Sequence, residues 1–259
     1  MPLVAARGIS HHVQEVGAGP TVVMVHGLLI GSVASWYFTA APALAAEHRV
    51  RVYDLRGHGR SERAPSGYST RELAADLAAL TDDLREPFDL VGHSWGALVA
   101  LQYALAHPTR VRRLALVEAP LPPAGAIEQL GFSVDDRELA TRLIDALPAS
   151  LRDAVTGGRR QATRLLASLS FLVGESTLLA DLRGEPDVDD ASLAALRVPT
   201  LLAYGDRSSC RPAGERLARA LPDATLVVLA GGHYLHLDAR AELAAALVEF
   251  CAPDNAEVS

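Results

Sequence analysis

The sequence contains no lysine, and all 24 of its basic residues are arginine. The absence of lysine excludes a Schiff-base lysine, a phosphate-binding P-loop lysine and a Ser-Lys nucleophile pair. The 31 acidic residues leave a net charge of −7. That balance argues against a protein that coats nucleic-acid phosphates with basic side chains. We therefore expect no nucleic-acid partner.

Cysteine is also scarce, with only Cys210 and Cys251 in the chain. Two isolated cysteines form neither a disulfide framework nor a CxxC site, and no HxE or HExxH motif occurs, so we expect no metal and no other cofactor. No segment sustains the roughly 18 apolar residues of a membrane span. Residues 1–10 lack a cationic stretch before a long apolar run. We therefore expect a cytoplasmic protein with reduced thiols and no membrane partner.

Short apolar runs alternate with helical periodicity along most of the chain. The predicted strands are residues 10–16, 21–25, 50–53, 88–91, 113–117, 199–204 and 225–229. The predicted helices between and after them are residues 33–46, 70–84, 96–106, 212–221 and 239–250. This alternation predicts an α/β fold with a mostly parallel central sheet covered by helices on both faces.

The alternation stops at the proline-rich residues 120–123 and returns only near residue 196. Between them the sequence shows helical stretches at 135–147, 159–173 and 175–183. A block of helices inserted into a strand–helix series is typical of a cap. We therefore predict an α/β core formed by residues 1–121 and 196–259, with a helical cap at residues 122–195.

Residues 92–96, GHSWG, have the G-x-S-x-G pattern directly after the predicted strand 88–91 and directly before a predicted helix. A serine at the apex of such a turn takes a strained backbone conformation, and the flanking glycines let neighbouring backbone pass closely. The turn presents the hydroxyl at the mouth of the sheet, beside a helix N-terminus that favours developing negative charge. The pattern therefore predicts that Ser94 is a nucleophile.

A serine hydroxyl needs a base, and the C-terminal third offers His233 and His236. His233 follows two glycines on the loop after the predicted strand 225–229, so it can lie over the nucleophile turn. We expect His236 to support that loop instead. The base in turn needs a carboxylate that fixes its tautomer.

Two carboxylates directly follow predicted strands and compete for that role. Asp206 lies at the carboxyl edge of the sheet, where sites on such sheets form. We expect Glu118, at the end of strand 113–117, to face solvent or the cap. The chain order Ser94, Asp206, His233 is the order expected for this architecture, so we predict these three residues as a catalytic triad.

With these residues the chain resembles the α/β-hydrolase superfamily over nearly its full length. The matching pieces, in chain order, are His26-Gly27 after an apolar strand, residues 54–61 (DLRGHGRS), the turn around Ser94, Tyr204-Gly205-Asp206 and Gly232-His233. The resemblance implies that the backbone amides of Leu28 and Trp95 form an oxyanion hole. It also implies that residues 54–61 shape the edge of the sheet and support the site.

The resemblance narrows the chemistry further. Haloalkane dehalogenases and epoxide hydrolases of similar appearance use aspartate at the turn, so Ser94 argues against both. Residues 28–31, LLIG, depart from the His-Gly-Gly-Gly form of many lipases and carbon–carbon bond hydrolases and give a bulkier, less polar lip. The apolar side chains expected to line a substrate pocket, with core or lid packing as the alternative for each, are Leu29, Trp36, Phe132 and Phe171.

The sequence thus predicts a cofactor-free serine hydrolase that acts on the carboxylic ester or thioester of a small acyl compound through an acyl-enzyme. One alternative is acyl transfer, cyclisation or carbon–carbon cleavage by the same triad in secondary-metabolite biosynthesis. The Ala- and Arg-rich composition, typical of GC-rich bacterial genomes, is compatible with that role. Another alternative is a catalytically silent ligand-binding protein of the same fold, against which the apparent triad argues.

Overall fold

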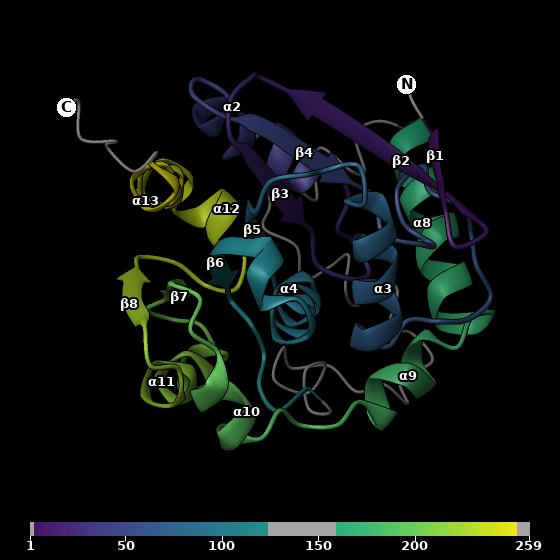
Figure 1. The fold of residues 1–259 in the computed structure, drawn as a ribbon. Helices are drawn as coiled ribbons and strands as arrows, with labels where there is room; N and C mark the ends of the chain where they lie inside the picture. Colours follow the sequence, from purple (N-terminus) through teal and green to yellow (C-terminus); the bar gives the residue numbers. More distant parts are fainter. Residues whose placement is uncertain (1–2, 124–158, 253–259) are drawn as a thin grey trace.

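The structure is a computed structural model that describes residues 3–123 and 159–252, built around one eight-stranded sheet (Figure 1). Its strands are β1 (Leu3–Ala6), β2 (Ile9–Val16), β3 (Thr21–Val25), β4 (Arg49–Tyr53), β5 (Phe88–His93), β6 (Val111–Val117), β7 (Thr200–Gly205) and β8 (Ala224–Leu229). Across the sheet the order is β1-β2-β4-β3-β5-β6-β7-β8. The pairs β1–β2 and β2–β4 are antiparallel, and all the other pairs are parallel. The predicted α/β architecture is confirmed.

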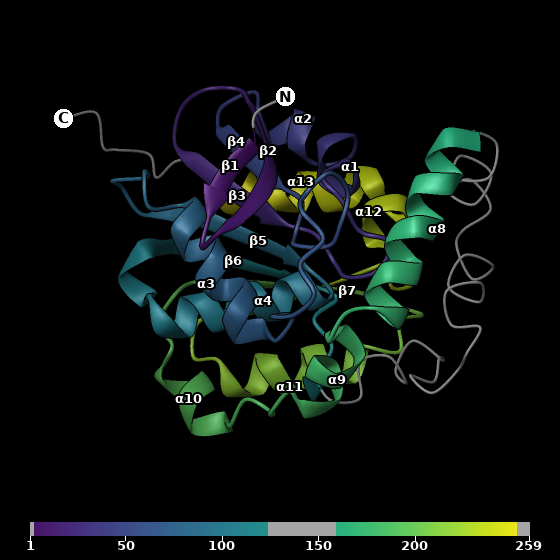
Figure 2. The ribbon, with the colours of Figure 1, turned by 90° about the vertical axis from the view of Figure 1, so that its right-hand side faces the viewer.

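Helices cover both faces of the sheet, as Figure 2 shows. One layer consists of α1 (Ala34–Tyr37), α2 (Ala41–Leu44), α12 (Leu235–Asp238) and α13 (Arg240–Cys251). The opposite layer consists of α3 (Thr70–Leu80), α4 (Trp95–Ala106), α10 (Asp190–Ala195) and α11 (Arg211–Ala220). Helix α8 (Arg159–Gly174) stands to one side of both layers and is followed by α9 (Leu178–Gly184).

Strand β3 illustrates why the central strands are apolar throughout. Val22 and Met24 belong to the hydrophobic cluster beneath α1, α2 and α13, whereas Val23 and Val25 belong to the cluster beneath α3 and α4. Successive side chains of a strand point to opposite faces, and all four of these side chains are fully buried. A strand covered on both faces therefore reads as a continuous apolar run instead of an alternating one.

Helix α3 begins as its sequence predicts. The Ser69 hydroxyl accepts a hydrogen bond from the Glu72 amide and caps the helix. The Glu185 carboxylate, from the segment between α9 and α10, accepts a 2.9 Å hydrogen bond from the Thr70 amide and a further one from the Thr70 hydroxyl. This contact ties the start of α3 to the chain that follows α9.

Several short elements differ from the prediction. The single helix expected at 33–46 is two separate turns, α1 and α2, because Pro42 has no N–H with which to continue a helix. Strand β1 and helix α12 were not predicted, and each has four residues, too few to show a period. Helix α10, of six residues, was also not predicted.

The described chain between β6 and β7 contains three helices, α8, α9 and α10. The first two agree with the helices predicted at 159–173 and 175–183. The helix predicted at 135–147 lies outside the described residues, so the proposed boundaries of a cap at 122–195 stay a prediction. Within residues 3–123 and 159–252, no single helix is long and apolar enough to cross a membrane. Residues Leu165–Gly174 and Leu178–Gly184 meet that length and composition only as a pair, which is bent by 57°.

Candidate active site

Ser94 lies at the turn between β5 and α4 in a conformation that few residues adopt. Its φ of 55° and ψ of −125° are strained for a residue with a side chain, as expected for a nucleophile turn. A Cβ atom on Gly92 would stand 2.3 Å from the Gly96 carbonyl oxygen, and one on Gly96 would stand 2.4 Å from the His26 carbonyl oxygen. Gly92 is therefore required for β5 to pass close to the start of α4, and Gly96 for the turn to pack against the end of β3.

His233 meets the nucleophile from the loop after β8. Its Nε2 atom lies 2.9 Å from Ser94 Oγ. The loop is held by its backbone: Gly231 N donates to Asp206 Oδ1 at 2.8 Å, Gly232 N donates to Asp238 Oδ2 at 2.9 Å, and the His233 carbonyl accepts from His93 Nε2 at 2.8 Å. The imidazole is thus fixed in place before any substrate binds.

The carboxylate beside the histidine is Glu118, not Asp206. Glu118 Oε2 lies 3.3 Å from His233 Nδ1, and the glutamate is fully buried. Its other contacts come from Gly205 N, 2.5 Å from Oε1, and from the Ser208 hydroxyl, which donates to Oε2. A buried charge needs such hydrogen bonds, and this carboxylate has three donors around it.

The structure therefore does not place Asp206 beside the imidazole, where the predicted triad puts it. The Asp206 side chain is about half exposed and lies beside Arg207, and its Oδ1 accepts the Gly231 amide instead of approaching the imidazole. Asp206 acts on the histidine only through the backbone of its loop. The expectation that Glu118 faces solvent or the cap is wrong for the same reason, because the side chain points inward along the sheet edge.

A thiol completes the surroundings of the imidazole. Cys210 Sγ lies 3.6 Å from His233 Nδ1, and the cysteine is fully buried. Burial, and then the charge of Glu118, raise the pKa of this thiol to about 12, so it is protonated and unreactive at neutral pH. No catalytic role was predicted for Cys210 or Ser208, because nothing in their local sequence indicates a neighbour more than twenty residues away.

The loop after β3 approaches the nucleophile from the other side. A Cβ on Gly27 would lie 3.1 Å from Ser94 Cβ, so the Gly27–Leu28 peptide adjoins the serine. Among the hydrogen bonds of the described residues, neither Leu28 N nor Trp95 N has an acceptor. Two unpaired amides beside a serine are what an oxyanion hole requires.

A buried histidine holds this loop in shape. Leu29 has a left-handed φ of 67°, and its amide donates to His58 Nε2 at 2.8 Å. His58 Nδ1 lies 2.8 Å from the Arg56 carbonyl, so the ring donates there and keeps Nε2 as an acceptor. Burial, and then the neighbouring His26, lower the pKa of His58 to about 3, which keeps the ring neutral. This is the support that the resemblance implied for residues 54–61.

Comparison with known proteins identifies the family of this fold. Residues 20–168 match the family described as "alpha/beta hydrolase fold". The chain belongs to this family. It is 34% identical over 241 residues to the pimeloyl-[acyl-carrier protein] methyl ester esterase of Chromobacterium violaceum (strain ATCC 12472), an alignment that covers 83% of this chain and 87% of that protein.

Two solved α/β-hydrolase structures are also similar over most of the chain. One is described as "Est816 as an N-Acyl homoserine lactone degrading enzyme", with 26% identity, a TM-score of 0.72 and coverage of 96% and 100% of the two chains. The other is a thioesterase domain from the curacin biosynthetic pathway, with 27% identity, a TM-score of 0.72 and coverage of 96% and 98%. These relatives support hydrolase activity on esters.

The side chains predicted to line a substrate pocket of this α/β hydrolase occupy different places. Trp36 is buried in the core beneath the site, where its indole N–H donates to the Val25 carbonyl, so the prediction that it lines the pocket is wrong. Leu29 lines a pocket of about 360 Å³ behind the loop, together with Phe38 of the chain after α1. Phe171 is half-buried on α8, and Phe132 lies outside the described residues.

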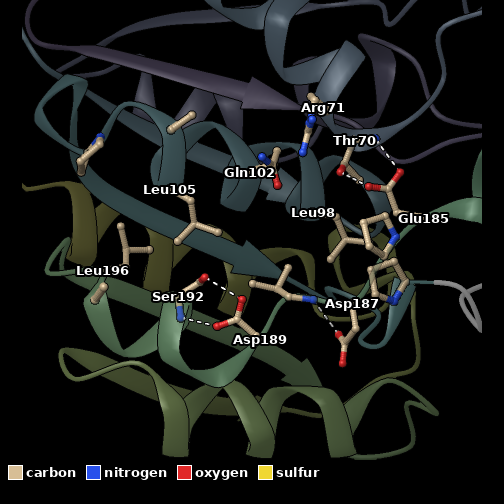
Figure 3. Close-up of a pocket in the computed structure, with 16 residues that line it drawn as sticks. Thr70, Arg71, Leu98, Gln102, Leu105, Glu185, Asp187, Asp189, Ser192 and Leu196 are labelled. Carbon is tan, nitrogen blue, oxygen red and sulfur yellow. Dashed lines mark hydrogen bonds between the residues drawn. The ribbon is translucent and has the colours of Figure 1, made fainter.

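A larger groove, of about 590 Å³, lies on the outer side of α4 (Figure 3). It is lined by Leu98 and Gln102 of α4, by Thr70 at the start of α3 and by the segment from Glu185 to Leu196. Neither Ser94 nor His233 lines it. In this α/β hydrolase the groove in Figure 3 is therefore separate from the Ser94–His233 pair.

Proposed function

We propose that this protein is a serine hydrolase that cleaves a carboxylic ester or thioester through an acyl-enzyme, with Ser94, His233 and Glu118 as its triad. The observation that carries the proposal is the 2.9 Å contact between Ser94 Oγ and His233 Nε2, with Glu118 on the opposite ring nitrogen. Nucleophile, base and orienting acid are thus in contact in the order that nucleophilic catalysis needs.

The geometry supports a two-step reaction. The Nδ1–H of neutral His233 faces Glu118, so Nε2 presents a lone pair to the Ser94 hydroxyl. As Oγ attacks the carbonyl carbon, Nε2 takes the hydroxyl proton, and the negative charge of Glu118 stabilises the imidazolium. The imidazolium then protonates the leaving alcohol or thiol. Water, activated by the same histidine, hydrolyses the acyl-enzyme and regenerates the serine.

The oxyanion of each tetrahedral intermediate would accept hydrogen bonds from the amides of Leu28 and Trp95. Such donors contribute about 3 to 4 kcal/mol each to transition-state stabilisation, because they are already aimed at the position where charge develops. Trp95 N is also the first amide of α4, so the helix N-terminus adds favourable potential there. No cofactor enters this mechanism.

The substrate class follows from two observations. The relatives are named as a methyl ester esterase, a lactone-degrading enzyme and a thioesterase, which all act on acyl–oxygen or acyl–sulfur bonds. The lip formed by Leu28, Leu29 and Ile30 is apolar. A small acyl compound with an apolar group near its carbonyl carbon fits both.

The test is a fluorophosphonate label together with hydrolysis of p-nitrophenyl esters of increasing chain length. We expect one label per chain, located on Ser94 by peptide mass, and ester turnover that depends on chain length. The variant Ser94→Ala should do neither. Ser61, a buried serine whose hydroxyl bonds His12 N and the Asp54 carbonyl and not the triad, offers the matched control Ser61→Ala, which should still label. Wild-type protein that neither labels nor hydrolyses any ester would contradict the proposal.

His58 gives a further prediction for the oxyanion loop. Because His58 Nε2 accepts the Leu29 amide, His58→Ala leaves that amide unpaired and releases the neighbouring Leu28 amide. We expect kcat to fall by about 10- to 100-fold with a smaller change in KM, since a displaced donor weakens transition-state binding most.

The matched control for this prediction is His58→Gln, whose terminal amide places an acceptor near the position of Nε2. It should recover a large part of kcat. Equal losses in both variants, with equal losses of thermal stability, would indicate that His58 only supports the fold.

A further inference from the structure

The side of His233 that faces away from the serine carries a second set of functional atoms. Glu118 Oε2, Cys210 Sγ and His233 Nδ1 all lie within 4.8 Å of one another. They come from three separate parts of the sheet edge: the end of β6, the start of α11 and the loop after β8. Of the three residues, only His233 has exposed side-chain surface, about 10%.

The separations from His233 Nδ1 to the other two atoms match those of ligands around one tetrahedral ion. Zinc binds thiolate sulfur at about 2.3 Å and imidazole nitrogen or carboxylate oxygen at about 2.0 to 2.2 Å. In a tetrahedron these bond lengths place nitrogen and oxygen about 3.4 Å apart and nitrogen and sulfur about 3.6 Å apart. The structure has 3.3 Å from His233 Nδ1 to Glu118 Oε2 and 3.6 Å from His233 Nδ1 to Cys210 Sγ.

The chemistry of the three atoms points to the same ion. A thiolate, an imidazole and a carboxylate are all zinc ligands, and three protein ligands leave a fourth position for water. Ser208 donates to the Glu118 carboxylate and would orient it as an outer-shell partner. Binding the ion needs no rearrangement of the loop that carries His233, because both separations from His233 Nδ1 already match those of a tetrahedral site.

We propose that Glu118, Cys210 and His233 form a site for a thiophilic divalent cation, Zn²⁺ above all, and that the bound ion switches the hydrolase off. The binding itself is independent of the proposed function, and only its effect on turnover rests on that function. Nδ1 coordinates metal through the lone pair that appears when its proton moves to Nε2. Nε2 then carries a proton toward Ser94 and no longer accepts one, and Glu118 is withdrawn from the imidazole.

The protons balance in this step. The Nδ1 proton moves to Nε2 of the same ring, and the Cys210 thiol releases its proton to solvent as the Zn–S bond forms. One proton is released for each ion bound, and no electron is transferred. Affinity should therefore rise about tenfold for each pH unit in the range where the thiol of the free protein is protonated.

The experiment compares the two cysteines of the chain. Cys251 is fully buried like Cys210 but lies at the end of α13, away from the site, so Cys251→Ala is the matched control for Cys210→Ala. Zn²⁺ affinity is measured by competition with a chromophoric chelator, and Co²⁺ replaces Zn²⁺ for absorption spectra. Inhibition of p-nitrophenyl ester hydrolysis by Zn²⁺ and its reversal by EDTA are measured on the same samples.

We expect wild type and Cys251→Ala to bind one Zn²⁺ per chain, to show a thiolate-to-cobalt charge-transfer band with Co²⁺, and to lose at least about 90% of their turnover reversibly. Cys210→Ala should bind at least about 100-fold more weakly and resist inhibition. Cys210→Ser, which keeps a small polar atom, covers the case in which the alanine variant does not fold. Equal Zn²⁺ affinity in wild type and Cys210→Ala, or a Co²⁺ spectrum without a thiolate band, would overturn the proposal. If the wild type hydrolyses no ester, the proposed function fails, yet stoichiometry and the cobalt band still decide the metal site.

Discussion

Replacing Glu118 with glutamine is expected to lower kcat for ester hydrolysis by about 10⁴-fold. The glutamine amide can keep an oxygen toward Gly205 N, but its NH₂ group then faces His233 and Ser208. A donor beside Nδ1 makes that nitrogen the acceptor and places the ring proton on Nε2. That proton then points at Ser94 Oγ. In this tautomer Nε2 has no lone pair for the hydroxyl proton, so His233 cannot act as the base. Stopped assays with saturating p-nitrophenyl ester measure the effect.

The matched control is Asp206→Asn. Asparagine retains an Oδ1 oxygen that can accept the Gly231 amide, so the loop that carries His233 stays anchored. We expect less than about a tenfold change in kcat, because Asp206 does not touch the imidazole. Fluorophosphonate labelling should slow in Glu118→Gln and not in Asp206→Asn. The reverse pattern, with Asp206→Asn the more damaged enzyme, would show that the imidazole is oriented by Asp206 during turnover.

Acidification is expected to destabilise the protein by an amount comparable with its total stability. Burial lowers the pKa of His58 to about 3 and that of His236 to about 4, with charges on nearby histidines adding to both shifts. In the unfolded chain both groups titrate near their ordinary value of about 6.5. The folded state holds both rings in the neutral form, and the stability that this contributes is fully present above about pH 6.5. That stability is lost as the pH falls from 6.5 through 4 toward 3.

Each of these histidines contributes up to about 1.4 kcal/mol per pH unit over that window. Between pH 6.5 and 4 the two together lower the free energy of unfolding by on the order of 5 kcal/mol, against a typical total of about 5 to 15 kcal/mol. Denaturant unfolding at a series of pH values measures this slope. The stability should be flat between about pH 7 and 8, above the range in which these histidines titrate.

A substitution separates the titration of one histidine from general acid effects. His236 packs between the rings of Trp36 and His93, and its Nδ1 has no partner in the described structure, so His236→Phe keeps the packing and removes the titration. Between pH 4 and 6, the slope of the free energy of unfolding against pH should fall by close to the value expected for one proton. An unaltered slope in His236→Phe would show that His236 is already protonated in the fold.

The sequence predicted the nucleophile turn because its cause is local. A serine between two glycines, after an apolar strand and before a helix, specifies a backbone geometry within five residues, and the structure has that geometry at Ser94. The seven main strands were predicted for a similar reason, since apolar runs such as residues 21–25 are required wherever both faces are covered. Short elements such as β1 lacked that signal.

The acid could not be chosen from the sequence, because Glu118 and Asp206 both follow strands that end at the same edge. The choice depends on contacts across the sheet, where β6 lies between β5 and β7. Gly205 at the end of β7 and Ser208 in the loop after it supply hydrogen-bond donors for the longer side chain of Glu118. The one sequence signal for Glu118 was its position directly after an apolar strand, which the structure places beside the strand that carries the nucleophile. Trp36 was misplaced for a related reason, since apolar side chains in the core and in a pocket look alike in a sequence.

The position of Glu118 also divides the machinery unequally along the gene. The proposed nucleophile, its proposed acid and both proposed oxyanion amides all precede residue 122. Of the proposed catalytic residues, only His233 comes from beyond the helices between β6 and β7. An exchange confined to the chain between β6 and β7 would leave all three proposed triad residues in place, provided that β7 still pairs with β6. The block between those strands can therefore vary in sequence without moving the residues of the proposed reaction.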